Sequence, residues 1–128
     1  MSNRTPLFDQ IDTFIIRVAD YKAAAAWYAV TLGLEATFID PDECLAVLPL
    51  AHGSSLTLWQ CTQGDSSTDP TPAGAFPIFA TSDAAWAMEE LKSRGVTVGD
   101  LIDRPGVRYF QFFDLDGNHL EACQVFDV

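Results

Sequence analysis

The sequence predicts an α+β fold in which two βαβββ modules combine their strands into a cup-shaped mixed sheet. Two segments carry the same order of signals: an apolar run, an aspartate that can cap a helix, an alanine-rich amphipathic stretch, and three extended runs. A stretch rich in Ser, Thr, Pro and Gly separates the two segments and is typical of a linker. The predicted boundaries are 8–61 for the first module, 62–75 for the linker and 76–126 for the second module.

The first module opens with an apolar run at 11–18, which predicts a strand. Asp20 follows as the N-cap of a helix that is expected to end at Gly33. The residues expected on the buried face of this helix recur at helical spacing, and they are Ala23, Trp27 and Val30. Three further strands are predicted over the extended runs 35–40, 43–50 and 54–61.

The second module repeats this order, with a strand predicted at 75–81, Asp83 as the N-cap, and a helix ending near Gly95. The residues predicted on the buried face of that helix are Ala84, Ala87, Met88 and Leu91. The remaining strands are predicted over 96–102, 107–113 and 118–125. A single helix covers one face of each sheet, so the two bare faces are expected to form a concave ligand site.

The composition excludes several classes of function. Acidic residues outnumber basic ones by 18 to 7, for a formal net charge of -11, and the basic residues do not cluster, which argues against nucleic acid and anionic membranes as partners. No segment approaches the roughly 20 apolar residues that span a bilayer. The polar first residues lack the apolar run of a secretory signal, so a cytoplasmic location is expected. Cys44, Cys61 and Cys123 lack metal-binding spacing and are interpreted as small buried hydrophobic residues.

Two longer stretches resemble a known family. The segment DYKAAAAWYAVTLGLEA, and the segment GVRYFQFFDLDGNHLEACQ with its tight turn at 116–118, are similar to signatures of the glyoxalase/bleomycin-resistance/dioxygenase (vicinal oxygen chelate) superfamily. The resemblance covers nearly the whole chain. It implies the fold described above and, as is usual for proteins of this type, a homodimer.

The resemblance also implies where a metal ion would be held in the metal-dependent members of this family. The matching positions, on the first and last strand of each module, are Thr13, Thr57, Phe76 (or Pro77, if the register slips by one) and Glu121. Only Glu121 is a strong ligand for a divalent ion, which needs three or four nitrogen or oxygen donors. The expectation is therefore a protein with no metal ion and no cofactor.

Several candidate site residues are expected on the concave face. His119 shares the face of Glu121 by strand alternation, and the two form a candidate catalytic pair. Arg17 lies on the same strand face as Thr13. In the glyoxalase I branch of the family, an Arg at the matching place contacts the carboxylate end of glutathione, so the resemblance implies that Arg17 anchors an anionic group of a ligand or holds Glu121 ionised. The alternative is a salt bridge at the sheet edge or a solvated side chain. The residues expected to form an aromatic and apolar wall, or else plain core, are Trp59, Phe76 and Ile78.

Three functions remain open at this level. The first is a metal-free protein that binds a small organic molecule in the cup, with a cationic ligand favoured by the acidic charge. The second is a lyase, isomerase or dioxygenase of the same superfamily, with Glu121 as base or metal ligand. The third is an interaction protein that only dimerises. The sequence does not decide whether the chain is an enzyme, or whether the cup closes within one chain or between two.

Overall fold

The computed structural model describes residues 6–61 and 74–126, and their strands form two four-stranded sheets. The first sheet has the order β1-β4-β3-β2 and the second the order β5-β8-β7-β6. In the first sheet the strands are β1 (Thr13–Val18), β2 (Phe38–Asp40), β3 (Leu45–Pro49) and β4 (Ser55–Gln60). In the second sheet they are β5 (Ile78–Ala80), β6 (Ile102–Arg104), β7 (Val107–Phe113) and β8 (His119–Val125). In the first sheet β1 pairs in parallel with β4, and in the second β5 pairs in parallel with β8. The other pairs are antiparallel, so the predicted α+β class and mixed pairing are confirmed.

The first helix begins as α1 (Tyr21–Trp27) and continues without a break as a π-helix, η1 (Tyr28–Leu32). The carboxylate of Asp20 accepts hydrogen bonds from two backbone N–H groups of the first turn, as a good N-cap does. Gly33 ends the helix with a φ of 72°, a left-handed conformation that glycine adopts without strain. Both predicted helix boundaries are confirmed, while the π-helical turn has no counterpart in the prediction.

The buried face of this helix is a different one from that predicted. Ala23 lies exposed and Val30 is 82% exposed, and of the predicted set only Trp27 packs against the core, where it is half-buried. The side chains that face the sheet are those of Tyr21, Ala24, Tyr28 and Thr31. The two sets have similar helical spacing, and the second was overlooked because it carries polar hydroxyls. A buried Tyr is stable here because its hydroxyl has a hydrogen-bond acceptor in the second module.

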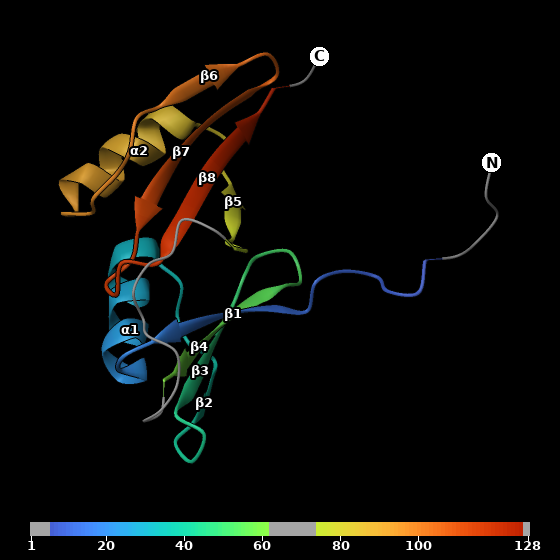
Figure 1. The fold of residues 1–128 in the computed structure, drawn as a ribbon, viewed down its shortest axis with the longest axis vertical. Helices are drawn as coiled ribbons and strands as arrows, with labels where there is room; N and C mark the ends of the chain where they lie inside the picture. The colour runs from blue at the N-terminus through green and yellow to red at the C-terminus, as the bar shows by residue number, and fades with distance from the viewer. Residues whose placement is uncertain (1–5, 62–73, 127–128) are drawn as a thin grey trace.

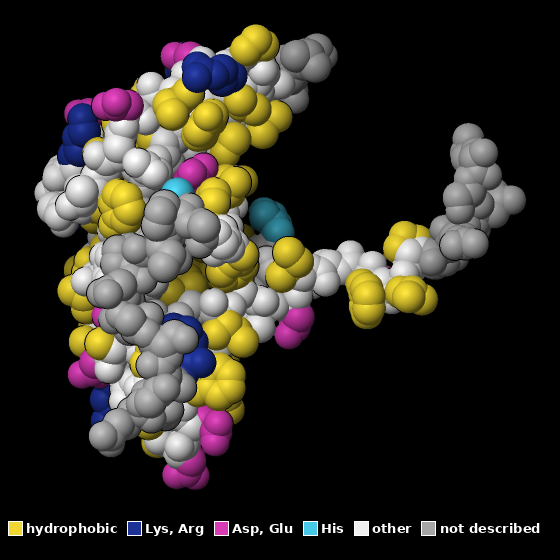
Figure 2. Space-filling view, viewed as in Figure 1, with side chains coloured by type: hydrophobic (Ala, Val, Ile, Leu, Met, Phe, Trp, Pro, Cys, Tyr) yellow, Lys and Arg dark blue, Asp and Glu magenta, His cyan; other side chains and the backbone are white. Residues whose placement is uncertain are grey.

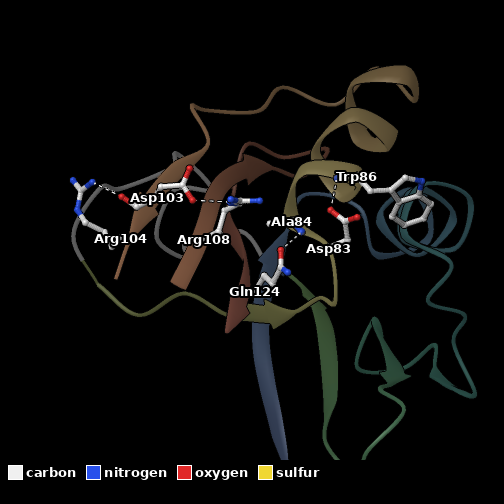
Figure 3. Close-up of polar contacts among 7 residues, drawn as sticks. All are labelled: Asp83, Ala84, Trp86, Asp103, Arg104, Arg108 and Gln124. Carbon is white, nitrogen blue, oxygen red and sulfur yellow. Dashed lines mark hydrogen bonds and ion pairs between the residues drawn. The ribbon is translucent and has the colours of Figure 1, made fainter. Parts of the chain in front are cut away.

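Two side chains cap the N-terminus of the second helix, α2 (Ala84–Ser93) (Figure 3). The carboxylate of Asp83 accepts from the N–H of Trp86, and the side-chain oxygen of Gln124 accepts from the N–H of Ala84. Gln60 makes the equivalent bond to the first residue of α1, so the repeat extends to individual hydrogen bonds. The figure also shows Arg108 bonded to Asp103 across the β6–β7 hairpin at 2.6 Å.

One predicted strand is largely wrong. Within 96–102 only Val98 makes an isolated bridge, to Phe112, and β6 starts at Ile102. Val96 is buried where the chain leaves α2, and Gly99 lies so close to Gln111 that an added Cβ would stand 2.7 Å from its Cγ. Two backbone hydrogen bonds still join the segment to β7, from Gly99 N–H to the carbonyl of Gln111 and from Phe113 N–H to the carbonyl of Thr97, but they do not extend into a regular ladder.

Both helices lie on the same side of the molecule, on the left in Figure 1, and the faces of the sheets that they leave bare point the other way. The core lies between helices and sheets, and its fully buried members include Val18, Leu48, Leu58, Phe110 and Leu120. Figure 2 shows the outline hollowed between the second module and the N-terminal arm (residues 6–12), with hydrophobic side chains gathered beside the hollow. No helix of the described ranges is long and apolar enough to cross a membrane.

A turn of the second module joins it to the first. Asp114, which is 7% exposed, accepts hydrogen bonds from the hydroxyl of Tyr28 at 2.7 Å and from the side chain of Asn118 at 3.0 Å. Asn118 also donates to the backbone carbonyl of Arg17, and Asp116 accepts from the backbone N–H of Ala19. This turn therefore fixes the start of β8 against the end of β1.

The same turn perturbs two titratable groups. Burial, followed by the charge and hydrogen bond of Asp114, raises the pKa of Tyr28 far above its ordinary value. Burial also raises the pKa of Asp116, with repulsion from Asp114 and Asp20 adding to the effect and the Ala19 hydrogen bond opposing it. The hydroxyl of Tyr28 therefore stays protonated and remains a donor.

Candidate functional site

Strand alternation sorts the side chains of both sheets into a helix-covered face and a bare concave face. On β8, Leu120 and Ala122 are buried beneath the helices, and Glu121 between them points to the opposite face. On β1 the buried residues are Ile16 and Val18. The candidates that alternate onto the concave face are Thr13 and Arg17 on β1, Thr57 and Trp59 on β4, Ile78 on β5, and His119 and Glu121 on β8.

In the first module, two candidate metal-ligand positions are occupied by hydroxyls that bond to each other. Thr13 Oγ1 and Thr57 Oγ1 lie 2.7 Å apart, and the hydroxyl of Ser55 donates to Thr13 Oγ1 at 2.8 Å. Thr57 is 7% exposed. Neutral hydroxyls that already share a hydrogen bond are poor donors to a divalent ion.

The guanidinium of Arg17 lies over the indole ring of Trp59 farther along the same face. Its Nε donates to the carbonyl of Trp59 and its Nη2 to the carbonyl of Gln60, both at 3.1 Å, and its guanidinium carbon lies 5.1 Å from the centre of the indole ring. The indole N–H donates in turn to the carbonyl of Glu43. A planar guanidinium stacked on a planar ring makes a flat cationic surface at this end of the concave face.

In the second module, an imidazole and a carboxylate form the most defined polar feature of the concave face. His119 Nε2 lies 2.9 Å from Glu121 Oε2, and the two side chains are only 19% and 16% exposed. Phe76 stacks on the imidazole, with ring centres 4.2 Å apart and planes 10° apart. The ring of Phe113 is tilted against the same imidazole, with ring centres 6.0 Å apart. The rings fix the imidazole beside the carboxylate, so the predicted His119–Glu121 pair is formed.

The electrostatic partner of Glu121 is therefore His119. The sequence suggested Arg17 for this role, yet the hydrogen bonds described for Arg17 run to carbonyls of β4 and the bond described for Glu121 runs to His119. Two residues of β7 that the sequence analysis did not name as site residues also border this pair. Gln111 lies opposite Glu121 in the ladder, and Phe113 lies opposite His119. Alternation along β7 from the buried Phe110 and Phe112 would have identified both.

The four positions at which the family's metal enzymes hold a metal ion do not fit one here. Two are the bonded hydroxyls of Thr13 and Thr57, one is the phenyl ring of Phe76, and only Glu121 offers a charged oxygen, which is bonded to His119. Within residues 6–61 and 74–126, no three His, Cys, Asp or Glu side chains gather in a way that would hold a metal. His52, the other histidine, lies exposed in a turn. Cys44, Cys61 and Cys123 are free thiols and only half-buried, which corrects the expectation that they are buried.

Comparison with known proteins places this geometry in a family. The model of the Glyoxalase/Bleomycin resistance protein/Dioxygenase superfamily matches residues 10–122. A member of that superfamily from Sphaerobacter thermophilus is 25% identical, with a TM-score of 0.75 over 93% of this chain and 99% of that one. A glyoxalase family protein from Bacillus anthracis is 20% identical, with a TM-score of 0.79 over 96% and 100%. TnmS3, an antibiotic binding protein from Streptomyces, is 23% identical, with a TM-score of 0.76 over 95% and 100%. None of the curated proteins matched the sequence.

Proposed function

Because this chain belongs to the Glyoxalase/Bleomycin resistance protein/Dioxygenase superfamily, we propose that it binds a small organic molecule, without a metal ion, on the concave face. The observation that carries the proposal is the His119–Glu121 pair, largely buried and stacked on Phe76, beside positions whose side chains do not suit a metal. A protein with the same fold, TnmS3, is an antibiotic binding protein, which supports this use of the fold.

The chemistry of the face indicates the kind of ligand. Trp59 and Phe76 contribute aromatic rings to this face, one covered in part by Arg17 and the other stacked on His119, and rings of this kind suit a planar organic molecule. Glu121 offers carboxylate oxygens that can accept hydrogen bonds from a protonated amine. The net charge of -11 raises the local concentration of cations around the protein. We therefore favour a planar molecule that carries a positive charge.

The proposed assembly is a homodimer. The N-terminal arm exposes Leu7 (90%) and Phe8 (82%), and the second module exposes Ile78 (57%) and Val125 (72%). Large apolar side chains exposed on neighbouring elements favour association with another apolar surface. A second copy supplies the same surfaces by symmetry.

A second candidate function is an enzyme, and the 2.9 Å contact between His119 and Glu121 favours it. A carboxylate oriented by an imidazole can remove a proton from a bound substrate, with the imidazole supplying or receiving a proton in turn. A metal-free lyase or isomerase is consistent with this arrangement. For a metal-dependent dioxygenase we derive no step, because Thr13, Thr57 and Phe76 do not provide ligands.

The experiment is a thermal-shift screen of planar cationic and neutral molecules, followed by calorimetric titration of each ligand that stabilises the protein. Glu121→Gln and Arg17→Met should weaken binding of a cationic and an anionic ligand respectively, by roughly tenfold or more for a direct contact. Glu89→Gln, an exposed glutamate of α2, is the matched control and should bind as the parent does. If ligands are found and all variants bind alike, the concave face is not the site. Ligand uptake with a pH-dependent conversion to product would favour the enzyme.

A further inference from the structure

A second hollow lies on the opposite side of the second sheet from Glu121. It is bounded by the end of η1 and by α2, and its volume is about 380 Å³. Small-molecule sites commonly have volumes of roughly 300–1,000 Å³. Ala122 lines the hollow while its neighbour Glu121 points to the concave face, so the two sites are separated by the thickness of the sheet. This hollow is therefore independent of the proposed function.

The body of the hollow is apolar and is built from both modules. The first module contributes the chain that leaves η1, and the second contributes α2 together with the helix-covered face of its sheet. The apolar side chains that form the walls and floor are Leu32, Leu34, Phe79, Ala87, Leu91 and Phe112. A surface of this kind favours a flat hydrocarbon body and offers nothing to an ion.

The polar groups of the hollow are fixed and neutralise each other. Arg94 Nη1 donates to the backbone carbonyl of Thr31 at 2.7 Å, and its Nη2 lies 3.1 Å from a carboxylate oxygen of Glu90. The guanidinium thus bridges from α2 to the π-helical turn of the first module. Such turns are often found at functional sites because they displace backbone and side chains locally. With Arg94 paired to Glu90, the hollow carries no excess charge.

An exposed indole borders the same hollow. Trp86, on α2, is 61% exposed although it is among the largest apolar side chains of the chain. Aromatic rings that stay exposed at the rim of an apolar hollow can stack on a flat ligand. Figure 3 shows the ring of Trp86 projecting away from Asp83 and Gln124 at the start of α2.

We propose that this hollow is a second small-molecule site and that it takes an uncharged, planar aromatic molecule of about two or three fused rings. The apolar walls hold the rings, and Trp86 covers them from the rim. A carbonyl or hydroxyl oxygen on the ligand accepts a hydrogen bond from the Arg94 guanidinium, which has N–H groups beyond those used by Thr31 and Glu90. Because residues of both modules line the hollow, an occupied site also stabilises their arrangement.

The test uses prodan, an uncharged naphthalene ketone dye whose emission shifts to the blue and brightens in an apolar site. The expected result is saturable binding of one dye per chain. Ala87→Phe fills the hollow and should abolish this binding, and Trp86→Ala should weaken it by roughly two- to tenfold. Ala23→Phe, the same change at an exposed position of α1, is the matched control and should leave binding unchanged.

Ile78→Trp distinguishes the two faces, because it adds a ring to the concave face only. If Ile78→Trp still binds the dye, the result supports the hollow as the site. If Ile78→Trp loses binding while Ala87→Phe still binds the dye, the dye occupies the concave face and the proposal is overturned. Absence of saturable binding to the parent also overturns it. If Ala87→Phe is not folded by circular dichroism, the Trp86→Ala result decides, since that side chain is largely exposed and its removal spares the core.

Discussion

The hydrogen bond between Tyr28 and Asp114 should be one of the larger single polar contributions to the stability of this fold. Tyr28 is fully buried, Asp114 is 7% exposed, and their oxygens lie 2.7 Å apart. Tyr28→Phe removes the hydroxyl and keeps the ring, so packing in the core is preserved. The raised pKa of Tyr28 keeps its hydroxyl protonated at neutral pH, where the measurement reports this hydrogen bond alone.

The magnitude follows from the surroundings of the carboxylate. A hydrogen bond to a charged group contributes about 1.5–3 kcal/mol. In the variant, Asp114 keeps the backbone N–H groups of Asp116 and Asn118 and the side-chain amide of Asn118, so it does not become unpaired. We expect a loss of about 2 kcal/mol in the free energy of unfolding. For a chain of this length that corresponds to a fall in Tm of roughly 6–10 °C.

The assay is urea denaturation at pH 7, followed by circular dichroism and compared with calorimetry. Tyr109→Phe, which removes a hydroxyl from the half-buried Tyr109, serves as the control and should cost less than about 0.5 kcal/mol. A double-mutant cycle of Tyr28→Phe with Asp114→Asn should give a coupling energy of about 1 kcal/mol or more. A Tyr28→Phe variant as stable as the parent, with no coupling to Asp114, would refute the role assigned to this bond.

Three further predictions concern the turn, the metal and the assembly. Asp116→Asn should stabilise the protein at pH 7 by at most about 1 kcal/mol, because the carboxylate is only half-buried and solvent screens its charge. The raised pKa of Asp116 means that its charged form costs stability at neutral pH, while Asn keeps an oxygen for the N–H of Ala19. This gain should disappear as the pH falls below the ordinary pKa of an aspartate, where the carboxyl is protonated in both the folded and the unfolded protein, and a gain that grows on acidification would contradict the sign. Elemental analysis after mild dialysis should find no stoichiometric zinc, nickel, manganese or iron, and a ratio near one per chain would reject the metal-free proposal. Sedimentation at micromolar concentration should give twice the 14.0 kDa of one chain, and a monomer would reject the dimer.

The local signals in the sequence determined where the helices begin and which strand residues share a face. Asp20 and Asp83 cap helices because a carboxylate just before a helix satisfies N–H groups a few residues away. Alternation on β8 separated Glu121 from its buried neighbours for a similarly local reason, since successive side chains point to opposite faces. The His119–Glu121 pair, two residues apart on one strand, followed from the same rule.

Only the tertiary structure decided which of two helical faces is buried and which groups meet across modules. Two sets of residues on the first helix have comparable spacing, and burial of the set with Tyr28 depends on Asp114, an acceptor 86 residues away. The same holds for the stack of Phe76 on His119 and for the hydrogen bonds of Arg17 to β4, which the sequence had directed toward Glu121. Short-range patterns fix backbone geometry and alternation, whereas contacts between distant residues depend on how the modules pack, and spacing along the chain does not encode that packing.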